Sequence, residues 1–494
     1  MAEQEADFNP ISNTPDKVKY SDLISQGTDC TTTERVFVPN NGTVFNYSNV
    51  KTIRIPLAIQ SDHFLDTSQS FLRFKIKNTT ASVPASHKAV IYPDPTYYSV
   101  FRRLRWEGSD GQSIEDLNHA NLLHSMLYRL QVGEDHYSSI GTLVNGGSDT
   151  SSPFGHNQGI GATETITVTV GLLSTFWNAH RYCPAGFVKG SPLTLELELD
   201  NPEHCLYSQG NVNETTGVIS STAPTINYEI TNVELVCQAV HFSSGFNQTF
   251  NQMLQSVGGV QYHSTGYHSV VNVAQSASDV NINIPVRTMS LKGIVHVLQD
   301  NDILNTYNRF CLSERVSRFM KDYVHYIGGA SFPIKKVQLS YQDQGHAFME
   351  LLKCFGNMNN IHASSHIKRD TGMTLDDAKG VVPSADNTTA TAEAGVATRY
   401  KQINAFYPKT RTATSKATST DKCSFLIGHD FENFQDQNLI SGLDLSSQSL
   451  PINLQATVQN YTTSTDNTPT IITSFVHSDY IYTLTSDGVI STSN

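Results

Sequence analysis

The segment Leu193-Thr-Leu-Glu-Leu-Glu-Leu199 places a leucine at every second position, with one polar residue between successive leucines. Side chains alternate between the two faces of a β-strand, so this segment predicts a strand with one buried and one wet face. Asp279-Val-Asn-Ile-Asn-Ile284 repeats the pattern later in the chain. The two segments indicate an all-β protein built from half-buried strands.

Other runs of the same kind are separated by polar, turn-rich segments in both halves of the chain. In the first half they lie at 51–57, 71–77, 100–106, 165–170 and 226–240. In the second half they lie at 291–298, 337–341, 424–427, 452–458, 471–475 and 480–484. Many short strands joined by such segments are typical of sandwiches and barrels.

The length of the chain, 494 residues, suits two β units better than one. The strand pattern is interrupted between Phe242 and Gly259, by Ser243-Ser-Gly-Phe-Asn-Gln248. We therefore expect an N-terminal arm at 1–44, a first unit at 45–245 and a second unit at 246–494.

Two segments have helical periodicity and predict one helix in each half. Residues 113–130 open with a capping-box-like Ser113 and Asp116, and apolar residues follow at three-to-four spacing. Residues 345–356 place four apolar side chains on one face and end at Gly356. One helix in each half is consistent with a duplicated unit.

Charge argues against a nucleic-acid-binding role. The chain has 33 basic and 45 acidic residues, a net charge of -12, and its first residues are acidic rather than basic. An acidic protein gains no counterion release on nucleic acid, so we expect no strong direct binding. Charged residues make up only 16%, which suits strands joined by polar loops better than solvated helices.

The N-terminal residues, the apolar runs and the cysteines bear on cellular location. The opening Met1-Ala-Glu-Gln-Glu5 does not match a secretion signal, and no long apolar run predicts a membrane-spanning helix. The seven cysteines contain no C-x-x-C pair, which favours reduced thiols. We expect synthesis in the cytosol of a host.

Motifs of catalysis are missing from the sequence. It contains no phosphate-binding loop, no G-x-S-x-G elbow and no H-E-x-x-H, and Gly159-Ile-Gly161 lacks a third glycine and predicts a turn. We therefore expect a protein that is not an enzyme, with no catalytic, cofactor-binding or metal-binding residues and no cofactor.

Two histidine pairs are the weak candidates for a metal site. His362 and His366 have the i, i+4 spacing of helical zinc ligands, but they lie in a loop-like segment with no third ligand. His263 and His268 are an odd number of positions apart, so they face opposite sides of a strand. Solvated or structural histidines are the expected interpretation of both pairs.

Acidic residues are the weak candidates for hydrolytic chemistry. Glu196 and Glu198 share one face of a predicted strand, as glycosidase carboxylates can, but a wet strand face explains them better. A second group is dispersed among loop residues and defines no site: Asp430, Glu432, Asp436 and Asp444.

Several segments, in a fixed order, resemble the double jelly-roll major capsid proteins of tailless phages, adenoviruses, virophages and polinton-like viruses. Residues 192–199 and then 228–235 resemble the close of the first barrel in that family. Residues 326–334, followed by the helix at 348–355, resemble part of the second barrel. Its final strands are resembled by 427–432, 439–444 and 480–490. The resemblance covers residues 45–490, with the loops unmatched.

The resemblance implies two jelly rolls standing side by side in one subunit. It also implies a homotrimer with a pseudo-hexagonal outline, which would tile the shell of an icosahedral DNA virus as its major capsid protein. Expected partners are further copies of the chain, a penton protein and minor or cement proteins. Genome contact would be left to other proteins or to an internal membrane, and the final location would be the virion capsid.

Long segments rich in small polar residues, at 137–164, 208–224 and 362–399, are either mobile surface or ordered contacts with neighbouring subunits. Two other functions stay open. One is a viral coat protein with a single jelly roll and a protruding domain. The other is a carbohydrate-binding β-sandwich or glycan hydrolase, for which only Trp106 and Trp177 could stack on sugars, and their apolar neighbours place both in a core.

Overall fold

The protein is described here by a computed structural model. The described residues are 29–82, 84–131, 141, 159–179, 181–213, 222–274, 279–300, 307, 311–313, 315–316, 320–339, 344–355, 422–423, 425–433, 440–446, 451–458 and 470–494.

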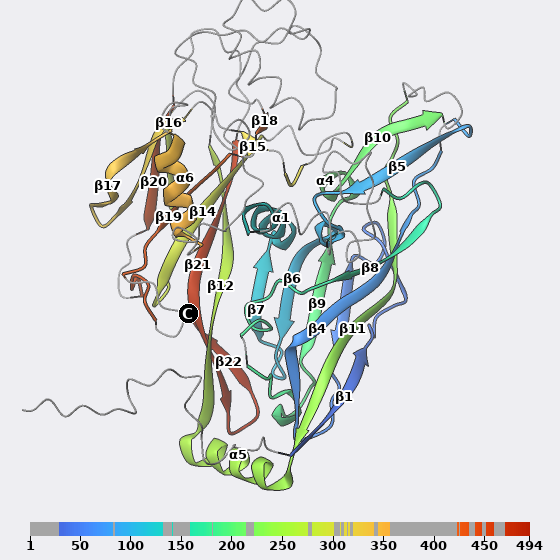
Figure 1. Ribbon diagram of the computed structural model, residues 1–494, viewed down its shortest axis with the longest axis vertical. Coiled ribbons are helices and arrows are strands. Elements are labelled where there is room, and N and C mark those ends of the chain that lie inside the picture. Colours follow the sequence, from blue (N-terminus) through green and yellow to red (C-terminus); the bar gives the residue numbers. More distant parts are fainter. Residues whose placement is uncertain are drawn as a thin grey trace, which may run out of the picture.

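Two antiparallel sheets form the first sandwich, shown in blue to green in Figure 1. The first sheet has the order β1 (Cys30–Phe37), β11 (Tyr228–Phe242), β4 (His63–Asn78), β8 (Thr165–Val170), and β2 (Val44–Phe45) also pairs with β11. The second sheet has the order β3 (Thr52–Pro56), β9 (Thr194–Leu199), β6 (Phe101–Glu107), β7 (Ser113–Asn118). A separate ribbon pairs β5 (His87–Pro93) with β10 (Leu206–Asn213).

The second sandwich repeats this layout. Its first sheet has the order β12 (Gly259–Ala274), β21 (Thr470–Thr485), β14 (Leu291–Asp300), β19 (Leu426–Asp430), and β22 (Ile490–Ser493) pairs with β21. Its second sheet has the order β13 (Val280–Ile284), β20 (Ile452–Val458), β16 (Met320–Ile327), β17 (Ala330–Gln338). Short strands β15 (Arg315–Val316) and β18 (Lys422–Cys423) also pair. In each half the last long strand lies beside the first, so both halves are jelly rolls.

Short helices occupy the connections between strands. They are the α-helices α1 (Ala120–Gln131), α4 (Pro202–Cys205), α5 (Ser244–Val257) and α6 (Gln344–Lys353), and the 3-10 turns η2 (Tyr97–Val100) and η3 (Ala185–Phe187). The two sandwiches stand side by side with their long strands upright, and α5 crosses between their lower ends (Figure 1). Within the described part of the chain, no helix is long and apolar enough to cross a membrane. The prediction of an all-β protein with two tandem jelly rolls is therefore confirmed.

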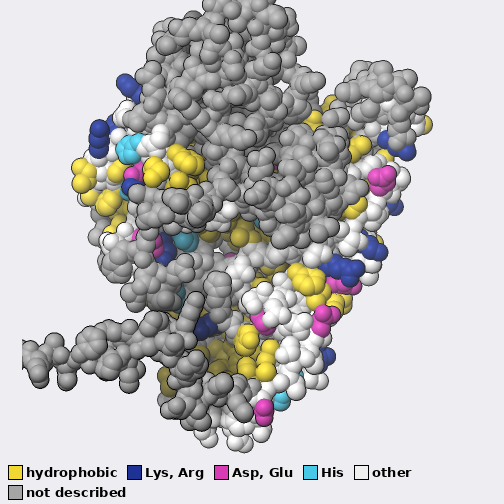
Figure 2. Space-filling view, in the orientation of Figure 1, with side chains coloured by type: hydrophobic (Ala, Val, Ile, Leu, Met, Phe, Trp, Pro, Cys, Tyr) yellow, Lys and Arg dark blue, Asp and Glu magenta, His cyan; other side chains and the backbone are white. Residues whose placement is uncertain are grey.

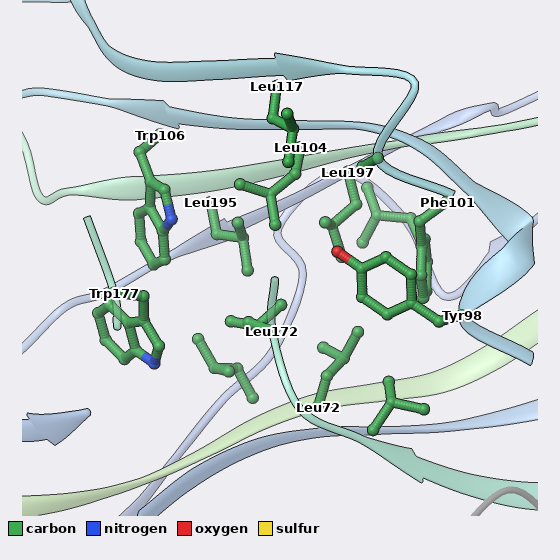
Figure 3. Packing of buried hydrophobic residues seen from close by; sticks show 14 of the residues in the cluster. Leu72, Tyr98, Phe101, Leu104, Trp106, Leu117, Leu172, Trp177, Leu195 and Leu197 are labelled. Carbon is green, nitrogen blue, oxygen red and sulfur yellow. The ribbon is translucent and has the colours of Figure 1, made fainter. Parts of the chain in front are cut away.

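The core of the first sandwich follows the alternation in the sequence. The leucines of β9 are buried, and the residues between them are partly exposed. Figure 3 shows the leucines of β9 and β6 packed with Trp106 and Trp177, which stack at a centroid distance of 4.8 Å and are both fully buried. The prediction that the two tryptophans lie in a core is confirmed, so neither offers a face to a sugar.

Some sequence predictions are wrong in detail. Residues 113–118 form β7 rather than the first turns of a helix, which begins only at Ala120. The reason is tertiary: β7 pairs along β6, and those ladder hydrogen bonds outweigh a local capping pattern. The predicted strands at 471–475 and 480–484 are one continuous strand, β21. Residues 206–213, partly assigned to a loop, form β10.

The described end of the expected N-terminal arm contributes to the first sandwich. Its strand β1 pairs with the whole C-terminal half of β11, from Cys30 opposite Phe242 to Phe37 opposite Leu235. Helix α5 occupies the segment in which the strand pattern is interrupted. No strand of 30–242 pairs with a strand of 259–493 among the described sheets, so the two sandwiches meet through side chains and loops.

Candidate functional site

The two sandwiches are joined by a buried contact made of aromatic and polar side chains. One continuous buried cluster contains Trp106 and Trp177 from the first half together with Tyr482 and Leu484 from the second. A second cluster lies wholly within the second sandwich. Because the first cluster is common to both halves, apolar burial opposes their separation.

The contact is built around the segment that follows β8. There Phe176 packs against Tyr262 of β12 and Tyr482 of β21, with ring centroids 6.4 and 5.3 Å apart. The same phenylalanine lies edge-on to Trp106, at 5.5 Å. Phe176 of the first sandwich therefore lies between Trp106 in the core of that sandwich and the two tyrosines of the second.

Backbone contacts fix the position of this segment. Ser264 of β12 donates its hydroxyl to the carbonyl oxygen of Thr175, at 2.9 Å. Gly266, also on β12, faces the Thr175 side chain so closely that a Cβ at position 266 would overlap it. The glycine thus makes room for a close approach between the halves, which no larger residue permits without movement.

A buried carboxylate holds the segment from the other side. Glu115, on β7, accepts hydrogen bonds from the backbone N–H groups of Thr175 (2.7 Å) and Phe176 (3.1 Å) and from the hydroxyl of Ser174 (2.5 Å). Burial raises the pKa of Glu115, and the hydrogen bonds that it accepts oppose this shift. Trp106 in turn donates its indole N–H to the Ser174 hydroxyl, at 3.0 Å.

A different carboxylate bonds directly from one half to the other. Asp94, at the end of β5, accepts hydrogen bonds from the backbone N–H groups of Leu312 (2.8 Å) and Ser313 (3.0 Å), and from the Ser313 hydroxyl. Ser125 of α1 donates to the Leu312 carbonyl oxygen, at 3.2 Å. Both Asp94 and Ser125 are buried, so these bonds are shielded from water.

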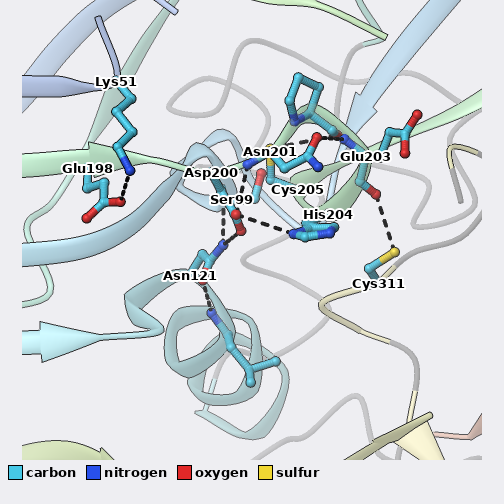
Figure 4. A network of polar contacts seen from close by, with 12 residues as sticks. Lys51, Ser99, Asn121, Glu198, Asp200, Asn201, Glu203, His204, Cys205 and Cys311 are labelled. Atoms are coloured by element: carbon cyan, nitrogen blue, oxygen red, sulfur yellow. Dashed lines mark hydrogen bonds and ion pairs between the residues drawn. The ribbon is translucent and has the colours of Figure 1, made fainter. Parts of the chain in front are cut away.

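The end of β9 contributes a third polar group beside this region (Figure 4). Asp200 accepts hydrogen bonds from the Asn121 side chain of α1 (2.7 Å) and from the backbone N–H of Asn201 (2.8 Å). Nearby, the thiol of Cys311 donates to the carbonyl oxygen of Glu203, at 3.4 Å. The segment at 311–313 is therefore anchored to the first sandwich at several places.

These groups are suited to holding two sandwiches in one orientation. Glu115 and Asp94 each accept two backbone N–H groups and a serine hydroxyl, and charged acceptors strengthen such bonds. Glu115 positions the contact segment within the first sandwich, whereas Asp94 bonds across to the second. Among the residues that the structure describes, no group of three or more His, Cys, Asp or Glu side chains has the geometry to hold a metal ion.

The acidic residues named from the sequence take part in separate ion pairs. Glu198 pairs with Lys51, which precedes β3, at 3.0 Å (Figure 4), and Glu196 lies 3.9 Å from Arg105 of β6. Both lie on the partly exposed face of β9. Cross-strand ion pairs at such places stabilise a fold by about 0–1 kcal/mol.

The second acidic group is divided among different contacts. Glu432 pairs with Lys292, at 2.6 Å, whereas Asp430 accepts the Glu432 backbone N–H. Asp444 accepts two hydrogen bonds from Ser446, which lower its pKa. Asp436 lies outside the described residues.

The histidine pairs are not joined into one site. His263 pairs with Asp479, at 2.7 Å, whereas burial lowers the pKa of His268. His362 and His366 lie outside the described residues. Gly161 begins a turn that is closed by the Glu164 N–H, as the sequence predicts.

Sequence reasoning did not find the residues at the contact. The sequence predicts a helix over 113–130, which would include Glu115, and neither Asp94 nor Gly266 belongs to a motif. In the structure Glu115 is buried beside Ile114 on β7. What identifies these residues is their partners, which lie about 60 to 220 positions away in sequence.

The paired sandwiches define a double jelly-roll protein, and solved viral structures share this fold along nearly the whole chain. The Faustovirus major capsid protein matches with a TM-score of 0.56 and 10% identity, over 94% of this chain and 92% of that one. A chain of the Sputnik virophage structure matches with a TM-score of 0.53 and 11% identity, over 96% and 90%. A chain of the PBCV-1 virus capsid matches with a TM-score of 0.52 and 9% identity, over 96% and 100%.

No protein-family model matches the sequence, and no curated protein matches it. At the identities found, the structural likeness establishes the fold. The alternative of one jelly roll with a protruding domain is wrong, because the chain contains two sandwiches of the same layout.

Proposed function

We propose that the protein is the major capsid protein of an icosahedral DNA virus and acts structurally rather than as an enzyme. The observation that carries the proposal is the pair of upright jelly rolls joined through a buried contact, in a fold shared with the Faustovirus major capsid protein over 94% of the chain. In this proposal 45–245 and 246–494 are the two structural units. The mature location is the virion capsid.

Three subunits would form each capsomer. Each subunit contributes two similar sandwiches, so a trimer presents a pseudo-hexagonal outline that can tile a flat facet. A closed ring of three requires heterologous contacts, in which two different patches of each chain meet. Two exposed apolar edges on opposite outer sides of the molecule support this arrangement (Figure 1).

The first edge belongs to β17. After Phe332 the pairing of β17 with β16 shifts register, and Ile334 projects with 95% of its side chain exposed. Lys335 and Lys336 follow it and are exposed. Figure 2 shows hydrophobic and basic side chains together at this outer margin. A fully exposed isoleucine at a sheet edge is a feature of contact surfaces.

The second edge belongs to β1 and β2, which lie along the same side of β11. Its exposed apolar residues are Val36, Val38 and Val44. An uncovered edge strand offers both backbone groups and apolar side chains to a neighbour. We assign the contacts within or between capsomers to these two edges.

Other partners follow from the proposed role. A penton protein would close the vertices, and minor or cement proteins would join capsomers. The acidic chain leaves genome contact to other components or to an internal membrane.

Size-exclusion chromatography with light scattering tests the trimer, and negative-stain microscopy tests the capsomer outline. The expected result is a particle of three chains with a hexagonal projection. A stable monomer at micromolar concentration would contradict the proposal.

A further inference from the structure

A row of three histidines lies inside the second sandwich, away from the contact between the halves. His296 belongs to β14 and His429 to β19, both in one sheet, whereas His325 belongs to β16 in the facing sheet. All three side chains are buried. Their rings are stacked, with centroids 5.2 Å apart for His296 and His325 and 5.8 Å apart for His325 and His429.

A histidine–histidine hydrogen bond crosses the core between the two sheets, as does the bond from the Tyr323 hydroxyl of β16 to the carbonyl oxygen of Gly428 on β19, at 2.8 Å. The Nε2 atoms of His296 and His325 are 2.9 Å apart, so one of them donates and the other accepts. His296 also shares a hydrogen bond with Ser474 of β21, through Nδ1 at 2.8 Å. With both rings neutral, one proton lies between the two Nε2 atoms and the bond is satisfied.

Among the residues that the structure describes, none gives this pair a directly bonded counter-charge. Glu350 of α6 contacts His429, at 3.2 Å, and also accepts from Lys353, at 2.6 Å. Within the described portion of the chain, no carboxylate is hydrogen bonded to His296 or His325. The other titratable or charged groups near the row are His346 and Cys354 from the α6 segment, Asp430 from β19 and Tyr323 from β16.

We propose that the His296–His325 bond is an acid-sensitive lock between the two sheets of the second sandwich. Uptake of one further proton by the neutral pair leaves an imidazolium buried without a partner anion, and uptake of a second further proton forces two cations together. Opening of the sandwich hydrates the rings and relieves this cost. Acid therefore favours local opening of the second jelly roll.

The lowered pKa values of His296 and His325 likewise predict that acid favours opening. Burial lowers the pKa of His296 to about 3, and burial together with the two neighbouring histidines lowers the pKa of His325 well below its usual value. A histidine with a depressed folded pKa stabilises the closed state above about pH 6.5, and this advantage is lost as the pH falls below that value.

Glu350 reinforces the effect at lower pH. Burial alone would raise its pKa, but hydrogen bonds from His429 and Lys353 lower the pKa to about 2. Its stabilising contribution is complete above about pH 4.5 and is lost as the pH falls toward 2. Between pH 6.5 and 4.5 the histidine pair therefore controls opening.

Hydrogen–deuterium exchange of the full chain at pH 7.5 and 5.0, corrected for intrinsic rates, tests the lock. Protection of β14 and β16 should fall by about 30-fold if one histidine takes up a proton on opening, and by about 1000-fold if both do. Acid also reduces protection in the first sandwich through His124, so β4 and β11 serve as a reference that substitution of the histidine pair should leave unchanged. The H296Q/H325Q variant keeps an amide pair that cannot titrate, so the acid-induced loss should be at least tenfold smaller.

A matched control replaces a buried histidine of the first half, His124→Gln, and should leave the response of β14 and β16 unchanged. An acid-induced loss at β14 and β16 that is unchanged in H296Q/H325Q, or a loss at β4 and β11 that this double variant abolishes, would overturn the proposal. If the double variant does not fold, C2-hydrogen exchange of the histidines in the wild-type chain decides: His296 or His325 titrating near pH 6.5 in the folded protein overturns the lock.

The consequence for a shell rests on the proposed function. If the chain tiles a capsid, acid would loosen the second jelly roll of every subunit and weaken its contacts. The exchange experiments use the free chain, so a protein that fails to form trimers can still show the lock.

Discussion

Gly266 of the second sandwich lies directly against the side chain of Thr175 of the first, in a space where a Cβ would overlap the Thr175 hydroxyl. Gly266 lies on strand β12, whereas Thr175 lies in the segment after β8. Ser264, also on β12, donates a hydrogen bond to the carbonyl oxygen of the same threonine. This close approach brings Phe176 within reach of Tyr262 and Tyr482. A missing side chain on β12 thus permits the contact between the jelly rolls.

Substitution of this glycine should separate or strain the contact. We expect Gly266→Val to lower the free energy of unfolding by about 1–3 kcal/mol or more, as overpacking of a tight interior does. Gly171→Ala is the matched control, because a Cβ there meets no neighbouring atom. Urea unfolding measures both, and an equal stability of the two variants would contradict the role of Gly266.

Loss of the Glu115 carboxylate should leave two backbone N–H groups without their acceptor. We expect Glu115→Ala to destabilise the protein by about 2–5 kcal/mol, because buried donors would lose a charged acceptor. Glu196→Ala removes a partly exposed ion pair instead and should cost about 0–1 kcal/mol. Thermal unfolding of both variants provides the comparison, and similar costs would refute the assigned role.

The exposed edge of β17 should matter for assembly but not for folding. We expect Ile334→Asp to shift the trimer toward monomer, because a carboxylate replaces an apolar contact, while the unfolding midpoint stays the same. Ile440→Asp is the control, since Ile440 is also exposed but lies outside the two proposed edges. Light scattering decides: an unaffected trimer in Ile334→Asp removes β17 from the interface.

Acid should also weaken the first half through His124, which stacks on Tyr98 at 4.6 Å. Burial lowers the pKa of His124 to about 4. The stability that its neutral form provides is complete above about pH 6.5 and is lost as the pH falls toward 4, a loss of about 2–3 kcal/mol at pH 4.5. We expect His124→Gln to flatten the pH dependence of unfolding in this window. An unchanged slope would show that His124 is hydrated.

The spacing of apolar residues in the sequence predicted individual strands and helices correctly where the same spacing governs which side chains are buried. Leu193 and the leucines of β9 are buried, and the predicted helix at 345–356 overlaps α6. It failed where a tertiary partner decided the outcome. Residues 113–118 carry a pattern typical of a helix N-terminus. Pairing with β6 nevertheless makes them a strand, in which the Glu115 side chain is buried.

The contact between the halves could not be predicted in the same way. Asp94 accepts N–H groups from residues more than 200 positions later, and nothing in its neighbourhood marks it as an anchor. The histidine row is likewise assembled from three strands, so no local spacing joins His296, His325 and His429.

The sequence by itself determined that the chain is all-β, that many strands alternate between a buried and a wet face, and that the pattern occurs twice. These properties follow from alternation along short segments, which neighbouring residues alone decide. Only the tertiary structure decided that Asp94 bonds one jelly roll to the other, that Glu115 holds the contact segment, and which histidines cross the second core. Those pairings depend on the path of the whole backbone, because it brings distant residues together in space.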